Sequence, residues 1–161
     1  MQKISPFLWF DSEAEAAVTF YLSLFEDSRI TTTLRYPQNS TIGEPGSVMS
    51  LGFELNGQEF MALNGGPEFT FSEAVSFEIT TETEGELDHY WERLSDGGEQ
   101  GPCGWLKDKF GLSWQVVPEG MVELFMSEDR EAASRAMAAM MKMGKLDLVA
   151  VREAFDGVAA R

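Results

Sequence analysis

The sequence has one cysteine and one histidine among its 161 residues. The lone Cys103 cannot form an intramolecular disulfide, which excludes the cross-linked scaffolds of small secreted proteins. The lone His89 stands beside Asp88, off the apolar stripe of its predicted helix, and we interpret it as a solvated surface residue. One histidine cannot supply a metal site of several imidazoles, and no Ser-His-Asp triad is evident.

Basic residues are also scarce. Lys and Arg number 12 against 27 Asp and Glu, a formal net charge of −15 at pH 7. This balance argues against nucleic-acid or anionic-membrane partners, because both attract an excess of cationic side chains. No apolar run is long enough to span a membrane, and the first residues lack the apolar core of a signal peptide. Hydrophobic residues still make up 43% of the chain, enough for a core, so we expect a folded cytoplasmic protein.

The first half of the chain predicts one strand, one helix and three further strands. Residues 4–10 are apolar and indicate a buried strand, and Ser12 and Glu15 have the spacing of a helix capping box. An apolar stripe at helical spacing follows, formed by Ala17, Phe20, Tyr21, Leu24 and Phe25. Alternating patterns over residues 30–36, 49–55 and 59–63 predict strands, and Asn56-Gly57 is typical of a type I′ hairpin turn.

A second round of the same pattern starts near residue 74. A strand over 75–79 precedes a helix whose apolar stripe is Leu87, Tyr90, Trp91 and Leu94, and short strands follow at 99–103, 105–107 and 112–117. The two rounds superimpose at an offset of 70, which pairs Phe7 with Phe77 and Tyr21 with Trp91. We therefore predict an α+β fold of tandem βαβββ modules.

The predicted organisation is a single domain, residues 1–161, built from modules 1–67 and 72–118 and a helical tail at 119–161. The tail carries a methionine-rich face that includes Met137, Met140 and Met141. We interpret this face as packing against the sheet or a second subunit; a promiscuous binding surface is the alternative.

Three stretches carry a resemblance to a known family: residues 6–11 (PFLWFD), 60–67 (FMALNGGP) and 103–118 (CGWLKDKFGLSWQVVP). They resemble the PhnB-like branch of the vicinal oxygen chelate superfamily, which includes glyoxalase I, ring-cleaving dioxygenases and bleomycin-resistance proteins. Members of the branch are often labelled 3-demethylubiquinone-9 3-methyltransferase. The resemblance covers nearly the whole chain, including the tail, and implies a cupped mixed sheet, commonly in a homodimer.

Metal-using members of this superfamily place His or Glu ligands on the first and last strand of each module. The resemblance maps these positions onto Ile4, Met61, Ala74 and Gln115. None of these side chains is a carboxylate or an imidazole, so we expect no metal and no cofactor. A register shift of two would bring in Glu59 or Glu78, still too few ligands. Cys103 lies between glycines, and we interpret it as buried or inert.

Strand alternation divides the predicted sheet into two faces. Phe7, Trp9, Phe77 and Ile79 are expected to face the helices. The concave face would then carry a pocket with a few polar groups on apolar walls, which suits a small organic ligand. The predicted ligand-binding residues on this face are Gln115, Met61, Ser113, Ser76, Glu78 and Leu8.

These expectations favour a metal-independent, homodimeric small-molecule binding protein of the glyoxalase/bleomycin-resistance type, with its ligand and any catalytic residues unknown. An enzyme is the alternative, either a metal-dependent lyase or isomerase or the labelled methyltransferase, and a structural dimeric module is a third possibility. Methyl transfer has little support in the sequence, because no alternating βα pattern with a glycine-rich turn is present.

Overall fold

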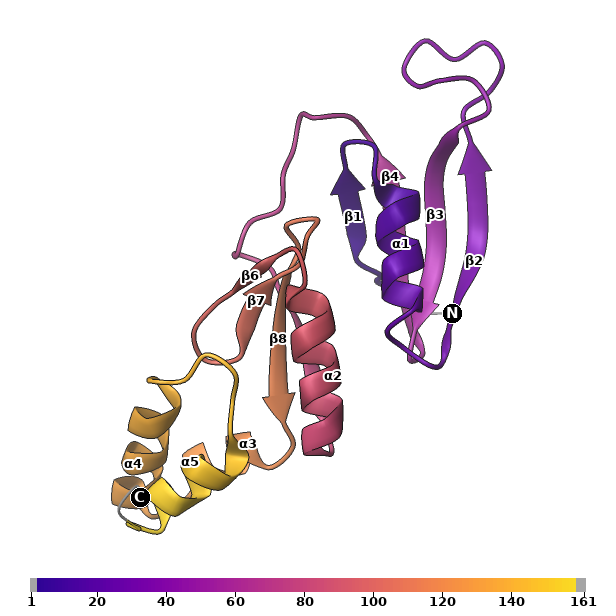
Figure 1. Cartoon of the computed structure of the whole chain (residues 1–161). Helices are drawn as coiled ribbons and strands as arrows, with labels where there is room; N and C mark the ends of the chain where they lie inside the picture. Colours follow the sequence, from indigo (N-terminus) through magenta and orange to yellow (C-terminus); the bar gives the residue numbers. More distant parts are fainter. Residues whose placement is uncertain (1–2, 159–161) are drawn as a thin grey trace. The chain divides into compact units, whose positions relative to one another are not determined.

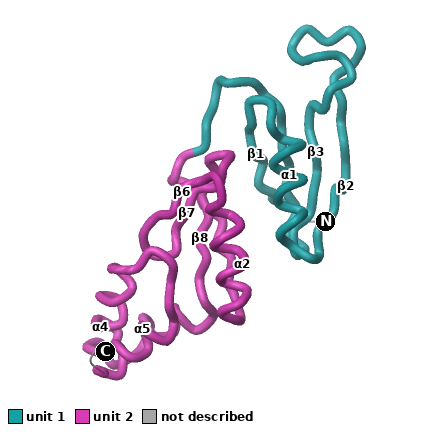
Figure 2. The backbone as a smooth tube through the Cα atoms, viewed as in Figure 1, with its two compact units in different colours: residues 1–71 teal, residues 72–161 magenta. Residues whose placement is uncertain are grey.

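The computed structural model describes residues 3–158. The chain folds into two compact units, Met1–Phe71 and Ser72–Arg161, whose boundary falls between the two predicted modules (Figure 2). Each unit contains one four-stranded mixed sheet. None of the helices in the described range has the length and apolar character needed to cross a membrane.

The first unit contains β1 (Phe7–Phe10), α1 (Ala14–Leu22), β2 (Ser28–Arg35), β3 (Val48–Leu55) and β4 (Gln58–Asn64) (Figure 1). The strand order is β1-β4-β3-β2, with β1 parallel to β4 and the other pairs antiparallel. Helix α1 covers one face, where the rings of Tyr21 and Phe53 stack with their centroids 6.4 Å apart. The predicted hairpin turn is confirmed, because Asn56 and Gly57 both have positive φ.

The second unit repeats this topology with β5 (Phe77–Thr81), α2 (Glu84–Ser95), β6 (Glu99–Gln100), β7 (Trp105–Lys107) and β8 (Ser113–Pro118). Its strand order, β5-β8-β7-β6, corresponds element by element to that of the first unit, and β5 is parallel to β8. Thr83 caps α2 by accepting a hydrogen bond from the Glu86 backbone N–H, and the Glu86 side chain accepts one from the Glu82 backbone N–H. The predicted α+β fold with a repeated βαβββ pattern is confirmed.

The two units differ by one residue between the first strand and the helix. The helices begin at Ala14 and Glu84, an offset of 70, whereas the strands before them end at Phe10 and Thr81, an offset of 71. Because side chains alternate along a strand, a shift of one residue exchanges its two faces.

The predicted orientation of β1 is wrong for this reason. Leu8 is 6% exposed and pairs in register with the buried Ala62, whereas Phe7 is 59% exposed. Leu8 therefore packs in the core on the helix-covered face and does not contribute to the open face, where it had been placed with the ligand-binding residues. In β5 the predicted orientation holds, because Phe77 packs against the buried Trp114.

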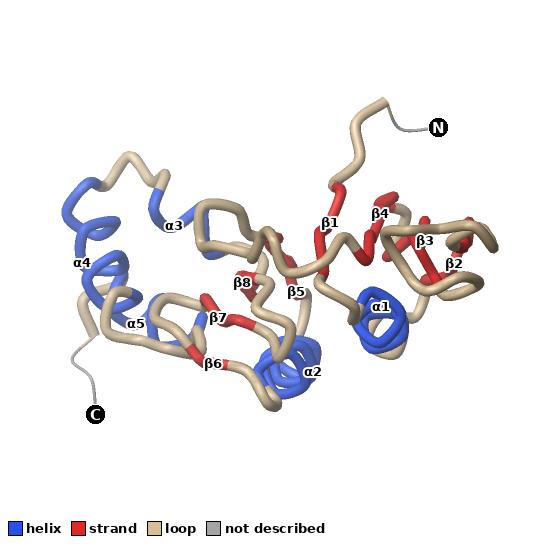
Figure 3. Tube along the Cα trace, turned by 90° about the horizontal axis from the view of Figure 1, so that it is seen from above, coloured by secondary structure: helices blue, strands red, loops and turns tan. Residues whose placement is uncertain are grey.

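The tail is helical, as predicted, and forms α3 (Met121–Phe125), α4 (Arg130–Met140) and α5 (Leu148–Phe155). Figure 3 shows them gathered at one end of the second unit. They enclose a small core of Met121, Ala136, Leu146 and Val151. The loop before α5 is joined to the loop before β7, since Cys103 and Gly104 donate backbone hydrogen bonds of 2.8 and 2.7 Å to the carbonyls of Met143 and Gly144.

A buried carboxylate sets the turn between β7 and β8. Asp108 is 2% exposed, and one of its oxygens accepts hydrogen bonds from the backbone N–H groups of Phe110 (2.9 Å) and Leu112 (3.1 Å). The other accepts from the indole nitrogen of Trp114 at 2.9 Å. Gly111, in the same turn, has a φ of +85°, a backbone conformation that favours glycine.

Replacing Asp108 by Ala is expected to lower the free energy of unfolding by about 2 to 4 kcal/mol, because three donors would lose a charged acceptor inside the protein. Urea denaturation measures this change. Asp96→Ala, at an exposed position after α2, is the matched control and should cost less than about 1 kcal/mol. Equal effects of the two substitutions would contradict the role of Asp108.

Candidate functional site

The second sheet has one face covered by α2 and one open face. Leu106, Trp114 and Val116 are buried on the covered side, together with the apolar stripe of α2. By alternation, the open face carries Trp105 and Lys107 from β7, Ser113 and Gln115 from β8, and Glu78 from β5.

Strand register brings these side chains together. Trp105 is the cross-strand partner of Gln115, and Lys107 is the partner of Ser113. Gln115 is also the partner of Glu78 on its other side. Side chains at such positions lie about 5 Å apart at their Cβ atoms, so this face presents one continuous group of polar and aromatic side chains.

Gln115 makes the direct contact that defines one edge of this group. Its Nε2 donates a hydrogen bond of 2.9 Å to Oγ of Ser76, in the residue just before β5. Four of the predicted site residues, Gln115, Ser113, Ser76 and Glu78, thus belong to the second unit, and Gln115 and Ser76 are in contact. Their role in ligand binding stays a prediction.

Met61 belongs to the first unit, where it is the register partner of Phe7 and Gly52 on the open face of that sheet. A Cβ on Gly52 would lie 3.3 Å from Sδ of Met61, which shows how closely the thioether covers this glycine. The expectation that Met61 lies beside Gln115 concerns both units and stays a prediction.

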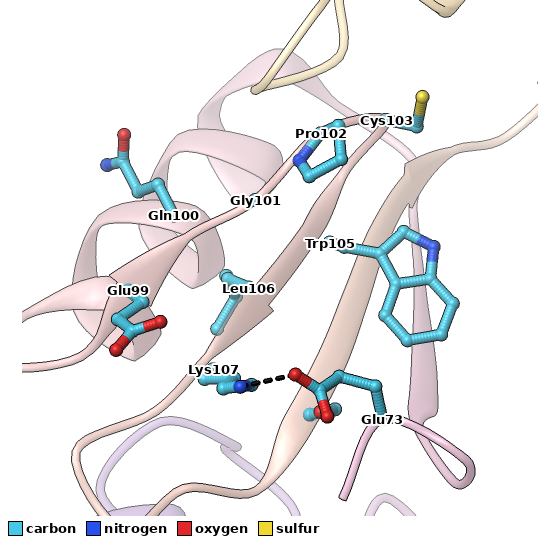
Figure 4. A pocket seen from close by; sticks show the side chains of 10 residues that line it. Glu73, Glu99, Gln100, Gly101, Pro102, Cys103, Trp105, Leu106 and Lys107 are labelled. Carbon is cyan, nitrogen blue, oxygen red and sulfur yellow. Dashed lines mark ion pairs between the residues drawn. The ribbon is translucent and has the colours of Figure 1, made fainter.

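A pocket of about 470 Å³ opens on this part of the second unit (Figure 4). Trp105, Lys107 and Ser113 line it from the strands, Glu73 lines it from the segment before β5, and residues 99–103 line it from β6 and the following loop. The residues predicted from the sequence to bind a ligand included neither Trp105 nor Glu73 or Glu99. Trp105 and Lys107 could have been found from Gln115, by alternation across the hairpin.

One ion pair crosses this region, between Nζ of Lys107 and a carboxylate oxygen of Glu73 (Figure 4). The hydrogen bond from Lys107 holds the pKa of Glu73 below its ordinary value. The same bond raises the pKa of Lys107, and the nearby negative charge of Glu99 adds to the effect. Both groups are therefore charged at neutral pH, and the pocket holds two carboxylates and one ammonium.

The hydroxyl of Ser113 is the distinctive feature of the pocket. Ser113 is 1% exposed and lines the pocket, and its Oγ is the one buried side-chain nitrogen or oxygen atom in residues 3–158 that has no hydrogen-bond partner within the protein. A buried polar group without a partner costs about 1 to 3 kcal/mol. The wall of the pocket therefore carries a hydroxyl that is buried and unsatisfied in the folded protein.

The strand register in the structure also differs from the one that we used to map the metal-ligand positions of the superfamily onto this sequence. Ile4 and Ala74 are exposed and precede β1 and β5, and the residue that reaches Gln115 is Ser76. With the strand offset of 71, the counterpart of Ser76 in the first unit is Ser5. Within residues 3–158, no group of three or more His, Cys, Asp or Glu side chains is arranged to hold a metal ion.

The single histidine and the single cysteine of the chain both lie away from this group of polar side chains. His89 is exposed on α2, as predicted. Cys103 lines the pocket at the rim, but its Sγ lies 3.8 Å from both the carbonyl oxygen of Met140 and Sδ of Met141, so the thiol contacts the helical tail.

Substituting Ser113 by Ala is expected to leave the free energy of unfolding unchanged or to raise it by about 1 kcal/mol, because the unpartnered hydroxyl is removed. Ser28→Ala is the matched control. Oγ of Ser28 donates to the carbonyls of Phe25 and Leu22, so its loss should lower the free energy of unfolding by about 1 kcal/mol. Urea denaturation compares the two, and a loss of 1 kcal/mol or more in Ser113→Ala would show that the hydroxyl has a partner in the folded protein.

The fold occurs in several solved structures. A putative 3-demethylubiquinone-9 3-methyltransferase, a PhnB protein from Bacillus cereus, is 40% identical, with a TM-score of 0.66 over 73% of this chain and 99% of its own. A protein from Pseudomonas aeruginosa is 18% identical, with a TM-score of 0.61 over 74% of this chain and 98% of its own. The fosfomycin resistance protein FosX from Mesorhizobium loti is 14% identical, with a TM-score of 0.57 over 79% of this chain and all of its own, and shows the fold alone.

No curated protein matches the chain. The family model described as 3-demethylubiquinone-9 3-methyltransferase matches residues 2–117, which include both βαβββ repeats and leave out α3, α4 and α5. The match therefore does not extend to the helical tail, which we had expected to share the resemblance. The chain belongs to the PhnB-like 3-demethylubiquinone-9 3-methyltransferase family, with the fold of the glyoxalase/bleomycin-resistance proteins.

Proposed function

We propose that the protein binds a small organic molecule without a metal ion, in the pocket on the open face of the second sheet. The observation that carries the proposal is the pocket itself, whose lining combines the half-buried indole of Trp105 with the ion pair of Lys107 and Glu73. The volume of about 470 Å³ is within the range of sites for small ligands, and the carbon surface of Trp105 and Pro102 provides an apolar wall. Gln115, the register partner of Trp105, is a further candidate contact together with its neighbours Ser76 and Glu78, although none of the three lines the pocket.

The chemistry of the donor set supports binding without a metal. Gln115 and Ser76 offer a neutral amide and a neutral hydroxyl, whereas Zn²⁺ and similar cations are bound by thiolate, imidazole and carboxylate groups. The nearby carboxylate of Glu73 is paired with Lys107.

Methyl transfer is the alternative that the family description favours. The glycine-rich turn after β4, residues 65–67, follows a strand, as a cofactor-binding loop would. In the structure it holds an aromatic side chain: the indole nitrogen of Trp9 donates 2.8 Å to the Gly66 carbonyl, and a Cβ on Gly65 would lie 2.4 Å from the same ring. No helix begins at this turn, so it lacks the arrangement that binds dinucleotide-type cofactors.

A thermal-shift screen of small uncharged organic compounds, with S-adenosylmethionine included, tests the proposal. Compounds that bind raise the melting temperature, because they stabilise only the folded state. The shift should survive dialysis against EDTA, and Gln115→Leu should weaken the affinity of these compounds about fivefold or more while the protein stays folded.

Gln58→Leu, at an exposed position in the hairpin between β3 and β4, is the matched control and should bind as the unmodified protein does. Shifts that vanish with EDTA would favour a metal enzyme. A shift produced by S-adenosylmethionine, followed by methyl transfer to a bound compound, would favour the alternative.

We also propose that the protein is a homodimer. Large apolar side chains lie exposed on the helical tail, with Met126 75%, Met141 62% and Val149 68% accessible. Apolar surface of this extent commonly marks an association site.

Light scattering at micromolar concentration should therefore give about 36 kDa, twice the chain mass of 17.9 kDa. Met126→Glu combined with Met141→Glu should lower this value toward the chain mass, because charges would replace the apolar contact. A value of about 18 kDa for the unmodified protein would contradict the proposal.

A further inference from the structure

We propose that the protein has a second site, which binds one soft monovalent metal ion, Cu(I), through three sulfur atoms. The ligands are the thiolate of Cys103 and the thioethers of Met137 and Met141, and we call these three residues the sulfur cluster. The site goes beyond the proposed function, because it lies where Cys103 meets the helical tail and uses none of the strand residues of the pocket. It is also distinct from the metal positions that were mapped from the superfamily, since it contains no carboxylate and no imidazole.

Two atoms of the sulfur cluster already have the separation of two ligands on one metal ion. Sγ of Cys103 is 3.8 Å from Sδ of Met141. A sulfur ligand lies about 2.3 Å from its metal ion, so two of them are about 3.8 to 4.0 Å apart in tetrahedral or trigonal coordination. The separation in the folded protein therefore suits a metal ion that both atoms share.

The third sulfur atom belongs to the residue one helical turn before Met141. The backbone N–H of Met141 donates a hydrogen bond of 3.0 Å to the carbonyl of Met137, so both side chains lie on the same helical face, and both line a cavity of about 380 Å³ on the tail. Methionine has a flexible, unbranched side chain, which lets the thioether of Met137 reach an ion held by Met141. Met140 and Met143, in contrast, pack against the core of the tail.

The backbone holds Cys103 against the tail. Its φ is +56°, in the left-handed region, and its N–H donates a hydrogen bond of 2.8 Å to the carbonyl of Met143, two residues after Met141. Figure 4 shows Sγ of Cys103 directed away from the ring of Trp105. The thiol is therefore presented to the methionines and not to the polar part of the pocket.

The chemistry of the ligands selects the metal. Thiolate and thioether groups are soft ligands that favour Cu(I), whereas Zn²⁺ is bound by thiolate, imidazole and carboxylate groups. Among the described residues that line the cavity beside Met137 and Met141, none carries a carboxylate or an imidazole that would favour a harder ion. One thiolate and two neutral thioethers also balance the charge of a single monovalent cation.

Competition with the chelator bathocuproine disulfonate, under nitrogen and with ascorbate present, measures the affinity of the full chain for Cu(I). We expect one Cu(I) per chain and an affinity for Zn²⁺ that is lower by about a hundredfold or more. Ag(I), which is also soft and monovalent but is not oxidised by air, is then added to protein labelled with ¹³C at the methionine methyl groups. The signals of Met137 and Met141 should shift and saturate at one equivalent.

Three substitutions identify the ligands. Cys103→Ser, Met137→Leu and Met141→Leu should each weaken Cu(I) binding by about tenfold or more, because losing a ligand costs at least as much as losing a group that supports one. Leucine has nearly the size and apolar character of methionine, so the two leucine variants remove a sulfur atom and retain the apolar surface of the tail. Met126→Leu is the matched control: Met126 is 75% exposed on the same tail but does not line the cavity, and this variant should bind Cu(I) as the unmodified protein does.

The outcomes decide between a built site and a reactive thiol. A Cu(I) affinity that survives both Met137→Leu and Met141→Leu would show that the cysteine binds alone, and would overturn the proposal. Binding of Zn²⁺ as tight as that of Cu(I), or one metal ion per two chains, would also overturn it. Absence of Cu(I) binding would reject the site without bearing on the proposed pocket, whose strand residues do not belong to the sulfur cluster.

Discussion

The buried carboxylate of Asp108 holds the hairpin on which the candidate site is built. Its three hydrogen bonds fix the turn after β7 and orient Trp114 into the covered face of the sheet. Because neighbouring residues of a strand point to opposite faces, Ser113 and Gln115 must then point to the open face. The cross-strand register with Trp105 and Lys107 follows from the same turn. The polar side chains of the pocket thus depend on a group that lies outside it.

The helices of the two repeats correspond at an offset of 70, yet the strands before them correspond at an offset of 71, so their side chains face opposite sides from those that the helix offset predicts. Both helices bury an aromatic residue at equivalent positions, Tyr21 in α1 and Trp91 in α2, so the helical stripe gave the correct offset. The connection between strand and helix has three residues in the first unit and two in the second. A pattern averaged over both repeats cannot detect this difference, and Leu8 was for that reason assigned to the wrong face.

The strands of the second unit and their open-face residues could be predicted from the sequence, whereas most residues that line its pocket could not. Alternation around Gln115 identified Ser113 and Glu78 on one face, and the structure places Ser76 in direct contact with Gln115. Glu73 was out of reach, because it lies in an irregular segment whose direction no periodicity describes, and its ion pair with Lys107 joins residues 34 positions apart. The loop at 101–104 was also out of reach, since its conformation depends on hydrogen bonds to residues 143 and 144 in the helical tail.

The four tryptophans offer the most direct test that the pocket on the second sheet is the binding site. Each gives one indole N–H signal in a ¹H–¹⁵N spectrum, and Trp105 is the one that lines the pocket, whereas Trp91 and Trp114 are buried and Trp9 belongs to the first unit. Assigned by single Trp→Phe variants, these signals can be followed while a compound that raises the melting temperature is added. The account predicts that the Trp105 signal moves most and saturates with the binding curve. An unchanged Trp105 signal, with the largest shift at Trp9, would place the ligand elsewhere and contradict it.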